Sequence, residues 1–381
     1  MEWEINTSLP VSYRNKISWG VLSPGNKDIY IWSSTGEGNS DRRLVVVDKK
    51  VNEIYGERIL AYFDHYKMPI RVVVLDGIEA NKSTESLFML LHEMESFNID
   101  RRNECVISVG GGVVADLVGF AASIYRRGVP YMRIPTTLLG IVDVSIAAKT
   151  GLNWSGRRNR LGSYYPPVCS LLDQTFIKTQ DPIEISSGMG EILKMAVIKN
   201  NTLFSYLEHH GRALLESKFD HELAGEVIAM SIQGMKEELE NNLWERNLKR
   251  CVDFGHSFSP TIEMRSLDTD NPMTHGQAVT IDIVLSCIIS KHRGLMSSKD
   301  FDRIISTAQN IGLKTFHPLF SDASLILEAL NDSVKHRAGS QNLPMPTNIG
   351  EYIFINDLSF EEIFIMVEEF KKINTLPCRN K

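Results

Sequence analysis

Three residues in the second half of the sequence have the side-chain types of a metal centre. Glu191 lies in the segment GMGEILKM, His256 in DFGH and His275 in THG. One carboxylate and two imidazoles are a ligand set typical of catalytic zinc, with further positions open to substrate. Lys194 follows Glu191 by three positions on a predicted helix and would share its face. A lone histidine is more often structural, and spacing cannot connect distant positions, so both interpretations stay open here.

A glycine-rich segment in the first half has the composition of a phosphate-binding turn. Residues 108–116, SVGGGVVAD, end a predicted strand, contain three glycines and begin a predicted helix. Glycine lets a backbone approach a phosphate closely, and a helix N-terminus offers free N–H groups. Asp48, at the end of an earlier predicted strand, is a candidate partner for a ribose hydroxyl. The spacing departs from G-x-G-x-x-G, so nucleotide binding and an ordinary turn are about equally supported.

Hydroxyl, carboxylate, amide and cationic side chains are concentrated between residues 135 and 159. They are Thr136, Thr137, Asp143, Lys149, Asn153, Arg158 and Asn159. This density, interleaved with small apolar residues, suits recognition of a polyhydroxylated, phosphorylated ligand. A solvated loop is the alternative, and we favour the ligand.

Short strands and helices alternate through the first half and would position these residues. The predicted strands are 44–47, 70–75, 105–109 and 131–134, and the predicted helices are 51–66, 83–95 and 113–125. Such alternation indicates a parallel sheet covered by helices on both faces. The segment 23–43 before the first strand has the composition of a loop or an edge hairpin.

The pattern becomes mostly helical after Asp181, which together with Pro182 and Glu184 forms a helix-start signal. A β-branched run at 352–355 and an amphipathic helix at 360–372 follow near the end of the sequence. Pro260 either kinks a helix or marks a helix that begins near Ser259. We therefore expect an α/β fold: a Rossmann-like parallel-sheet domain at 1–180, then a mostly α-helical domain at 181–381.

Composition excludes several classes of function. The 381 residues carry a formal net charge of −6 without a Lys/Arg-rich run, which argues against nucleic-acid and anionic-membrane partners. The five cysteines are scattered and form no short-spaced metal motif. No apolar run approaches the roughly 18 residues of a membrane span, and no signal peptide is recognisable. We expect a cytoplasmic protein.

Six motifs in order resemble the sugar-phosphate cyclases, the superfamily of dehydroquinate synthase. They are GGGVVADLVGFAASIYRRGV, IPTTLLG with VDVSIAAKTGLN, RRNRLGSYYPP, GMGEILKM, DFGHSFSP and THGQAV. The resemblance runs from about residue 48 to about residue 350. It implies an NAD-binding first domain, a metal- and substrate-binding second domain, and a homodimer. It also implies that Glu191, His256 and His275 bind the catalytic zinc, or cobalt.

The resemblance implies roles for further residues as well. Around NAD it places Asp48, Glu79, Lys82, Gly111, Gly112, Asp116, Thr136, Thr137, Lys149, Arg158, Phe176 and Thr179. Among the catalytic, substrate-facing residues it places Asp143, Lys149, Asn159, Lys194 and Asp253. Whether His336 and Arg337 reach the substrate stays open.

Departures from the dehydroquinate synthase pattern favour a different substrate. Pro260 stands where dehydroquinate synthases have a histidine, and Met235 stands where they have a lysine. The apolar segment 341–346 stands where they have a further lysine near the C-terminus. Fewer cations fit a substrate without a carboxylate, because an unpaired buried cation is costly. Gln277 stands where glutamate is usual, and we expect at most an indirect effect on the metal.

These departures resemble the branch that acts on sedoheptulose 7-phosphate, above all the 2-epi-5-epi-valiolone synthases. That branch implies transient oxidation by NAD, elimination of phosphate, reduction and intramolecular aldol closure. Cyclases that make 2-epi-valiolone or desmethyl-4-deoxygadusol, and 3-dehydroquinate synthase, are the nearer alternatives. A metal-dependent polyol dehydrogenase and a non-catalytic binding protein are more distant ones.

Overall fold

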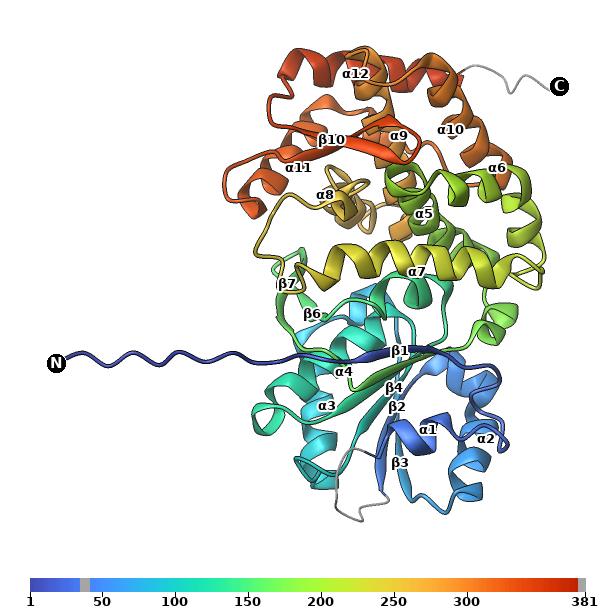
Figure 1. Cartoon of the computed structure of the whole chain (residues 1–381), viewed down its shortest axis with the longest axis vertical. Helices are drawn as coiled ribbons and strands as arrows, with labels where there is room; N and C mark the ends of the chain where they lie inside the picture. The colour runs from blue at the N-terminus through green and yellow to red at the C-terminus, as the bar shows by residue number, and fades with distance from the viewer. Residues whose placement is uncertain (35–41, 376–381) are drawn as a thin grey trace. The chain divides into compact units, whose positions relative to one another are not determined.

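The computed structural model describes residues 1–34 and 42–375, and these form two compact units (Figure 1). Unit 1 consists of Met1–Pro135, Ala147–Leu152 and Leu161–Asp173. Unit 2 consists of Thr136–Ile146, Asn153–Arg160 and Gln174–Lys381. We expected one boundary near residue 180. In the structure three short segments before that point, 136–146, 153–160 and 174–180, belong to the second unit.

Unit 1 is built on a six-stranded sheet in the order β1-β8-β5-β4-β2-β3, and every adjacent pair of strands is parallel. Its strands are β1 Arg14–Ile17, β2 Arg43–Asp48, β3 Ile70–Leu75, β4 Val106–Gly110, β5 Tyr131–Pro135 and β8 Cys169–Leu172. Its helices are α1 Asp28–Trp32, α2 Lys49–His65, η1 Glu79–Asn81, α3 Thr84–Phe97, α4 Gly112–Ile124 and η2 Tyr125–Arg127. The predicted parallel α/β fold is confirmed.

The prediction missed strands β1 and β8 of the sheet, the helix α1 and the single-turn helices η1 and η2. Strand β1 is short, polar and exposed, so no apolar pattern marks it, and it exists because it pairs with the distant β8. The segment 23–43 was predicted as loop or edge hairpin, but it contains the helix α1. Residues 35–41 of that segment lie outside the described part of the chain.

A two-stranded hairpin carries the polar segment that follows β5. It consists of β6 Lys149–Trp154 and β7 Arg157–Tyr164. Ser155 and Gly156 connect the strands with φ values of 50° and 68°, as in the tight turns that suit the twist of a hairpin. The base of the hairpin belongs to unit 1, and its tip, with Arg158 and Asn159, belongs to unit 2.

Unit 2 is mostly helical, as predicted. Its helices are η3 Gly140–Val144, η4 Gln174–Thr179, α5 Pro182–Lys199, α6 Asn201–Glu216, α7 Ala224–Glu240, η5 Cys251–Asp253, α8 Ser259–Ser266, α9 His275–His292, α10 Ser298–Ile311, η6 Pro318–Ser321, α11 Ala323–His336 and α12 Phe360–Thr375. An antiparallel hairpin, β9 Leu343–Asn348 and β10 Glu351–Ile355, precedes α12. Helix α8 begins at Ser259 with Pro260 in its first turn, so the proline starts a helix and does not kink one.

Helices α5 and α9 form the core of unit 2, and most of their residues are buried. Both helices therefore have apolar residues on most sides and little amphipathic pattern. Polar side chains in the buried middle of these helices, such as Glu191, Lys194 and Asp282, are surrounded by protein. Within the described residues, no helix is both long and apolar enough to cross a membrane.

Candidate metal centre

Glu191, His256 and His275 come together in unit 2 from three separate elements. Glu191 lies in α5, His256 lies between η5 and α8, and His275 is the first residue of α9. Each offers one ligand atom, and these atoms all lie within 4.8 Å of one another. Glu191 Oε1 is 3.1 Å from His275 Nε2 and 3.6 Å from His256 Nε2. The two Nε2 atoms are 3.4 Å apart.

Close approach of α5 and α9 sets the distance between Glu191 and His275. A Cβ atom added at Gly276 would collide with the Ser187 backbone, and one added at Gly190 would collide with the Gly276 carbonyl oxygen. The Gly276 N–H donates to Ser187 Oγ at 2.9 Å. The two glycines therefore allow a helix contact that larger residues would prevent.

Helix α9 also positions His256. The Asp282 carboxylate accepts hydrogen bonds from the N–H groups of Phe258 at 2.6 Å and Ser259 at 2.8 Å. These bonds tie the start of α8 to α9. His256 Nδ1 lies 3.1 Å from the Phe254 carbonyl oxygen, an acceptor, so Nδ1 carries the proton and Nε2 presents a lone pair.

The carboxylate of Glu191 is charged despite complete burial. Burial favours the neutral acid, but Lys194, His275 and His256 outweigh it and hold the Glu191 pKa well below its usual value. Lys194 Nζ lies 2.5 Å from Glu191 Oε2. Burial lowers the pKa of Lys194, but Glu191 and Asp143 outweigh that effect and raise it. Glu191, Lys194 and Asp143, all predicted from the sequence, therefore form one cluster of interacting charges.

The two histidines respond to this environment in opposite ways. Burial keeps the pKa of His256 well below its ordinary value, so its imidazole is neutral at neutral pH. Burial and Arg158 lower the pKa of His275, but Glu263 and Glu191 outweigh them and raise it to about 9. The difference arises because two carboxylates flank His275.

The donor set fits a divalent cation. Both oxygens of Glu191 are buried and neither receives a hydrogen bond of good geometry, although Lys194 and His275 lie within ion-pair distance. A buried carboxylate that lacks such bonds is costly. One carboxylate oxygen and two imidazole nitrogens facing one another are a common arrangement for zinc.

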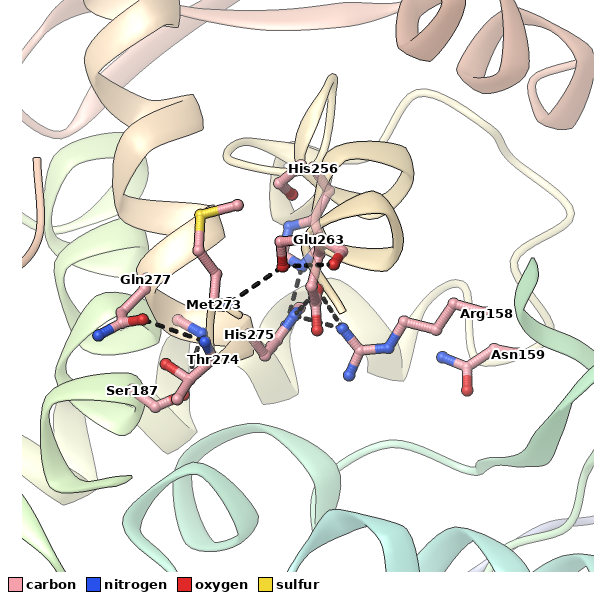
Figure 2. Close-up of polar contacts among 12 residues, drawn as sticks. Arg158, Asn159, Ser187, His256, Glu263, Met273, Thr274, His275 and Gln277 are labelled. Atoms are coloured by element: carbon pink, nitrogen blue, oxygen red, sulfur yellow. Dashed lines mark hydrogen bonds and ion pairs between the residues drawn. The ribbon is translucent and has the colours of Figure 1, made fainter. Parts of the chain in front are cut away.

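Sequence reasoning missed Glu263, which joins this group from α8. The side chain is buried, and its Oε2 atom lies 3.0 Å from His275 Nδ1 and forms an ion pair with Arg158 (Figure 2). Burial raises the pKa of Glu263, but Arg158 and His275 outweigh it and lower the pKa to about 2. An acidic residue inside the otherwise uncharged run SFSPTIEM was the available signal.

Gln277 has a structural role at the start of α9. Its Oε1 atom accepts a hydrogen bond from the Thr274 N–H at 3.1 Å, closing the first turn of the helix that presents His275 (Figure 2). This contact is the indirect kind of effect expected from the sequence.

Six residues predicted to lie around NAD belong to the Met1–Pro135 part of unit 1. Gly111 and Gly112 form the turn between β4 and α4. Lys82 Nζ pairs with Asp116 Oδ2 at 2.6 Å, and Glu79 begins η1 nearby in the chain. Asp48 Oδ1 accepts from the N–H groups of Lys50 and Val51, and Oδ2 accepts from that of Gly77. Asp48 thus caps α2 beside the glycine turn, where a Cβ on Gly110 would meet the Asp48 and Val114 side chains.

The other residues of the NAD prediction come later in the chain: Lys149 belongs to unit 1, and the rest belong to unit 2. Lys149 is exposed at the start of β6. Thr136 is buried, and Thr137 Oγ1 accepts from the Gly140 N–H at 3.0 Å. In η4 Phe176 is buried and its carbonyl oxygen accepts from Thr179 Oγ1 at 3.0 Å. Arg158 contacts Glu263 and His275, as described above. Contact of each of these residues with NAD therefore stays a prediction.

Two predicted catalytic residues have identified partners near the candidate ligands. The Asn159 N–H donates to Asn153 Oδ1 at 2.9 Å, which holds Asn159 beside Arg158 at the hairpin tip (Figure 2). Asp253 pairs with Arg250 at 2.5 Å and with Arg337 at 3.4 Å. Arg337, left open from the sequence, is buried here, whereas His336 Nε2 faces Arg160 at 3.2 Å near the surface.

Two family models match consecutive parts of the chain. The model described as 3-dehydroquinate synthase N-terminal matches residues 72–187, and the one described as 3-dehydroquinate synthase C-terminal matches residues 188–336. The chain belongs to the 3-dehydroquinate synthase-like sugar-phosphate cyclases. The family resemblance drawn from the motifs is confirmed.

Relatives named 2-epi-5-epi-valiolone synthase match nearly the whole chain. One from Actinomyces sp is 39% identical, covering 98% of each chain. One from Streptomyces albus is 41% identical, covering 95% of this chain and 88% of the relative. A solved structure of the synthase from Streptomyces hygroscopicus subsp. jinggangensis 5008, with NAD+ and Zn2+ bound, superposes with a TM-score of 0.92. It is 39% identical and covers 97% of this chain and 100% of that one.

Proposed function

We propose that this chain converts sedoheptulose 7-phosphate into 2-epi-5-epi-valiolone and releases phosphate, acting as a carbon–oxygen lyase. The observation that carries the proposal is the buried convergence of Glu191, His256 and His275 in a family member. Identity of about 40% to synthases with this name, over nearly the whole chain, supports the substrate. We further propose that it acts as a cytoplasmic homodimer.

NAD and a divalent cation, zinc or cobalt, would be the cofactors, as the similar solved structure with NAD+ and Zn2+ suggests. Bound cofactors of this kind supply reversible hydride transfer and polarisation of a substrate oxygen. Glu191, His256 and His275 would hold the cation. The residues that would surround NAD are those predicted from the sequence, with the glycine turn after β4 accommodating its phosphates.

Lys194 would act on the substrate as a fixed hydrogen-bond donor. Glu191 and Asp143 keep its ammonium group charged, although burial opposes that charge. A charged donor held by two carboxylates has little freedom to move, so it can orient a substrate oxygen. Lys149 and Asn159 would add donors for the phosphate and hydroxyl groups, and Asp253 would accept from a hydroxyl.

Incubation with sedoheptulose 7-phosphate, NAD and zinc or cobalt tests the proposal. We expect phosphate release that requires catalytic NAD, no net NADH, and 2-epi-5-epi-valiolone identified by NMR. The carboxylated substrate of dehydroquinate synthase, tested in parallel, should release little phosphate. Stoichiometric NADH would instead identify a polyol dehydrogenase, and a different cyclitol would identify a related cyclase.

A further inference from the structure

Glu263 and Arg158 compete for the same ring nitrogen of His275. Glu263 Oε2 lies 3.0 Å from Nδ1 and Arg158 Nη1 lies 2.8 Å from it. A carboxylate can only accept the Nδ1 proton, whereas a guanidinium can only donate to an unprotonated Nδ1. The two neighbours therefore favour opposite tautomers of the neutral ring, which is the form that can bind a cation.

Only one of these tautomers can bind a cation through Nε2. If Nδ1–H donates to Glu263, the lone pair on Nε2 points toward Glu191 Oε1 and His256 Nε2. If Nδ1 accepts from Arg158, the proton moves to Nε2, where Glu191 Oε1 at 3.1 Å can accept it. His256 has no such choice, because a backbone carbonyl receives its Nδ1 proton.

Glu263 is held firmly enough to decide between them. Its side chain is 6% exposed and pairs with Arg158, so the guanidinium is occupied by the carboxylate as well as by the ring. Ser266 Oγ donates to the Glu263 carbonyl oxygen at 2.7 Å and accepts from the Met273 N–H at 3.0 Å. These bonds join α8 to the segment that leads into His275 (Figure 2).

We infer that Glu263 is a positioning residue that selects the cation-binding tautomer of His275, with Arg158 opposing it. The inference rests on the proposed metal centre. Carboxylates that orient a ligating histidine typically contribute about 10- to 100-fold to metal affinity. Glu263 is expected to contribute in this range without touching the cation.

The test is titration of the metal-free full chain with Co2+, followed by the visible ligand-field spectrum. Affinity should fall by about 10- to 100-fold in Glu263→Leu. Glu263→Gln, which keeps an oxygen acceptor, should fall between that variant and the original chain. The absorption bands should shift in both variants, because the orientation of one ligand ring changes.

Glu104→Leu is the matched control. Glu104 is buried and pairs with Arg42, as Glu263 does with Arg158, but it lies in unit 1. It should bind Co2+ with unchanged affinity and spectrum. If Glu263→Leu fails to fold, Glu263→Gln still decides the question.

The outcomes separate the two proposals. Co2+ binding by the Glu263 variants that matches the original chain in affinity and spectrum overturns the inference but leaves the metal centre standing. Equal losses in the Glu263 and Glu104 variants also overturn it, since general loosening would then explain both. Failure of the original chain to bind Co2+ removes the metal centre itself, and the inference with it.

Discussion

In unit 1 Asp48 caps the helix that begins at the next residue, whereas in unit 2 Glu191 faces histidines that lie far along the chain. The polar groups of unit 1 occur where strands end and helices begin, so local structure places them. Those of unit 2 stand inside a helical core and depend on how helices pack. The first arrangement can tolerate movement of neighbouring helices, and the second cannot.

This difference predicts which substitutions each region tolerates. Loss of a cap in unit 1 affects one helix end and the binding groups beside it. A change at the contact between α5 and α9 would displace a ligand atom and a buried charge together. Buried charges are costly unless their partners stay in place. Substitutions at the metal centre of unit 2 should therefore have larger effects than loss of the cap in unit 1.

Replacing a candidate ligand should have the largest effect. His275→Ala should abolish stable metal binding and lower phosphate release by more than the roughly 100-fold that an indirect partner contributes. Metal content by mass spectrometry and phosphate release measure the two effects. His292→Ala, at the exposed other end of α9, is the control and should keep both metal and turnover. A metal-loaded, active His275→Ala chain would remove the assignment.

Separating α5 from α9 should have the next largest effect. Gly276→Ala places a methyl group against the Ser187 backbone and should cost about 1 to 3 kcal/mol of stability. Co2+ affinity should fall as well, because His275 moves with the helix start. Thermal unfolding and Co2+ titration measure both quantities.

Gly225→Ala provides the matched helical control for that change. A Cβ at Gly225 meets its nearest atom at 4.0 Å, so this variant should be neutral or slightly stabilised, with unchanged Co2+ affinity. Equal behaviour of the two alanine variants would mean that the glycine contact does not position the ligands.

A cap removed from unit 1 should have a smaller effect and should leave metal binding intact. Asp48→Ala should cost about 0.5 to 2 kcal/mol of stability, because the N–H groups of Lys50 and Val51 lose their acceptor. If Asp48 also binds a ribose hydroxyl, NAD affinity should fall about tenfold or more. Fluorescence titration with NADH and Co2+ titration check the two sites.

Asp322→Ala is the control for that cap. Asp322 caps α11 through the N–H groups of Ser324 and Leu325 in the same pattern. It should lower stability similarly without any change in NADH affinity. Equal NADH affinities in the two variants would limit Asp48 to its structural role.

The smallest expected effect is a pH dependence at the far end of α9. Arg293 bonds Glu362 on α12, and this bond outweighs burial and lowers the Glu362 pKa from 4.5 to about 2. The ion pair therefore stabilises the fold above about pH 4.5, and that stabilisation disappears as the pH falls through 2. Glu362→Gln should cost about 1 kcal/mol at pH 7, after allowance for solvent screening, and nearly nothing near pH 2.

Urea unfolding at several pH values measures that difference. Glu369→Gln, which removes an exposed ion pair with Lys372 on the same helix, should change stability little at any pH. A loss for Glu362→Gln that is independent of pH would show that packing, not charge, stabilises this contact.

The sequence by itself determined the elements whose signals are local. The strands β2 to β5, the helices between them and the glycine turn follow from hydrophobic period and from residues that start or end helices. The ordered motifs determined the family and named the candidate ligands. Strand β1 escaped prediction because its residues are polar and its pairing partner β8 lies far along the chain.

Only the tertiary structure decided how those named residues interact. It brought Glu191, His256 and His275 within reach of one another, and it placed the buried Glu263 in contact with both His275 and Arg158. No hydrophobic periodicity or residue spacing in the sequence predicts these contacts. They depend on two buried helices approaching closely at glycines, and that distance is a property of packing among residues far apart in sequence.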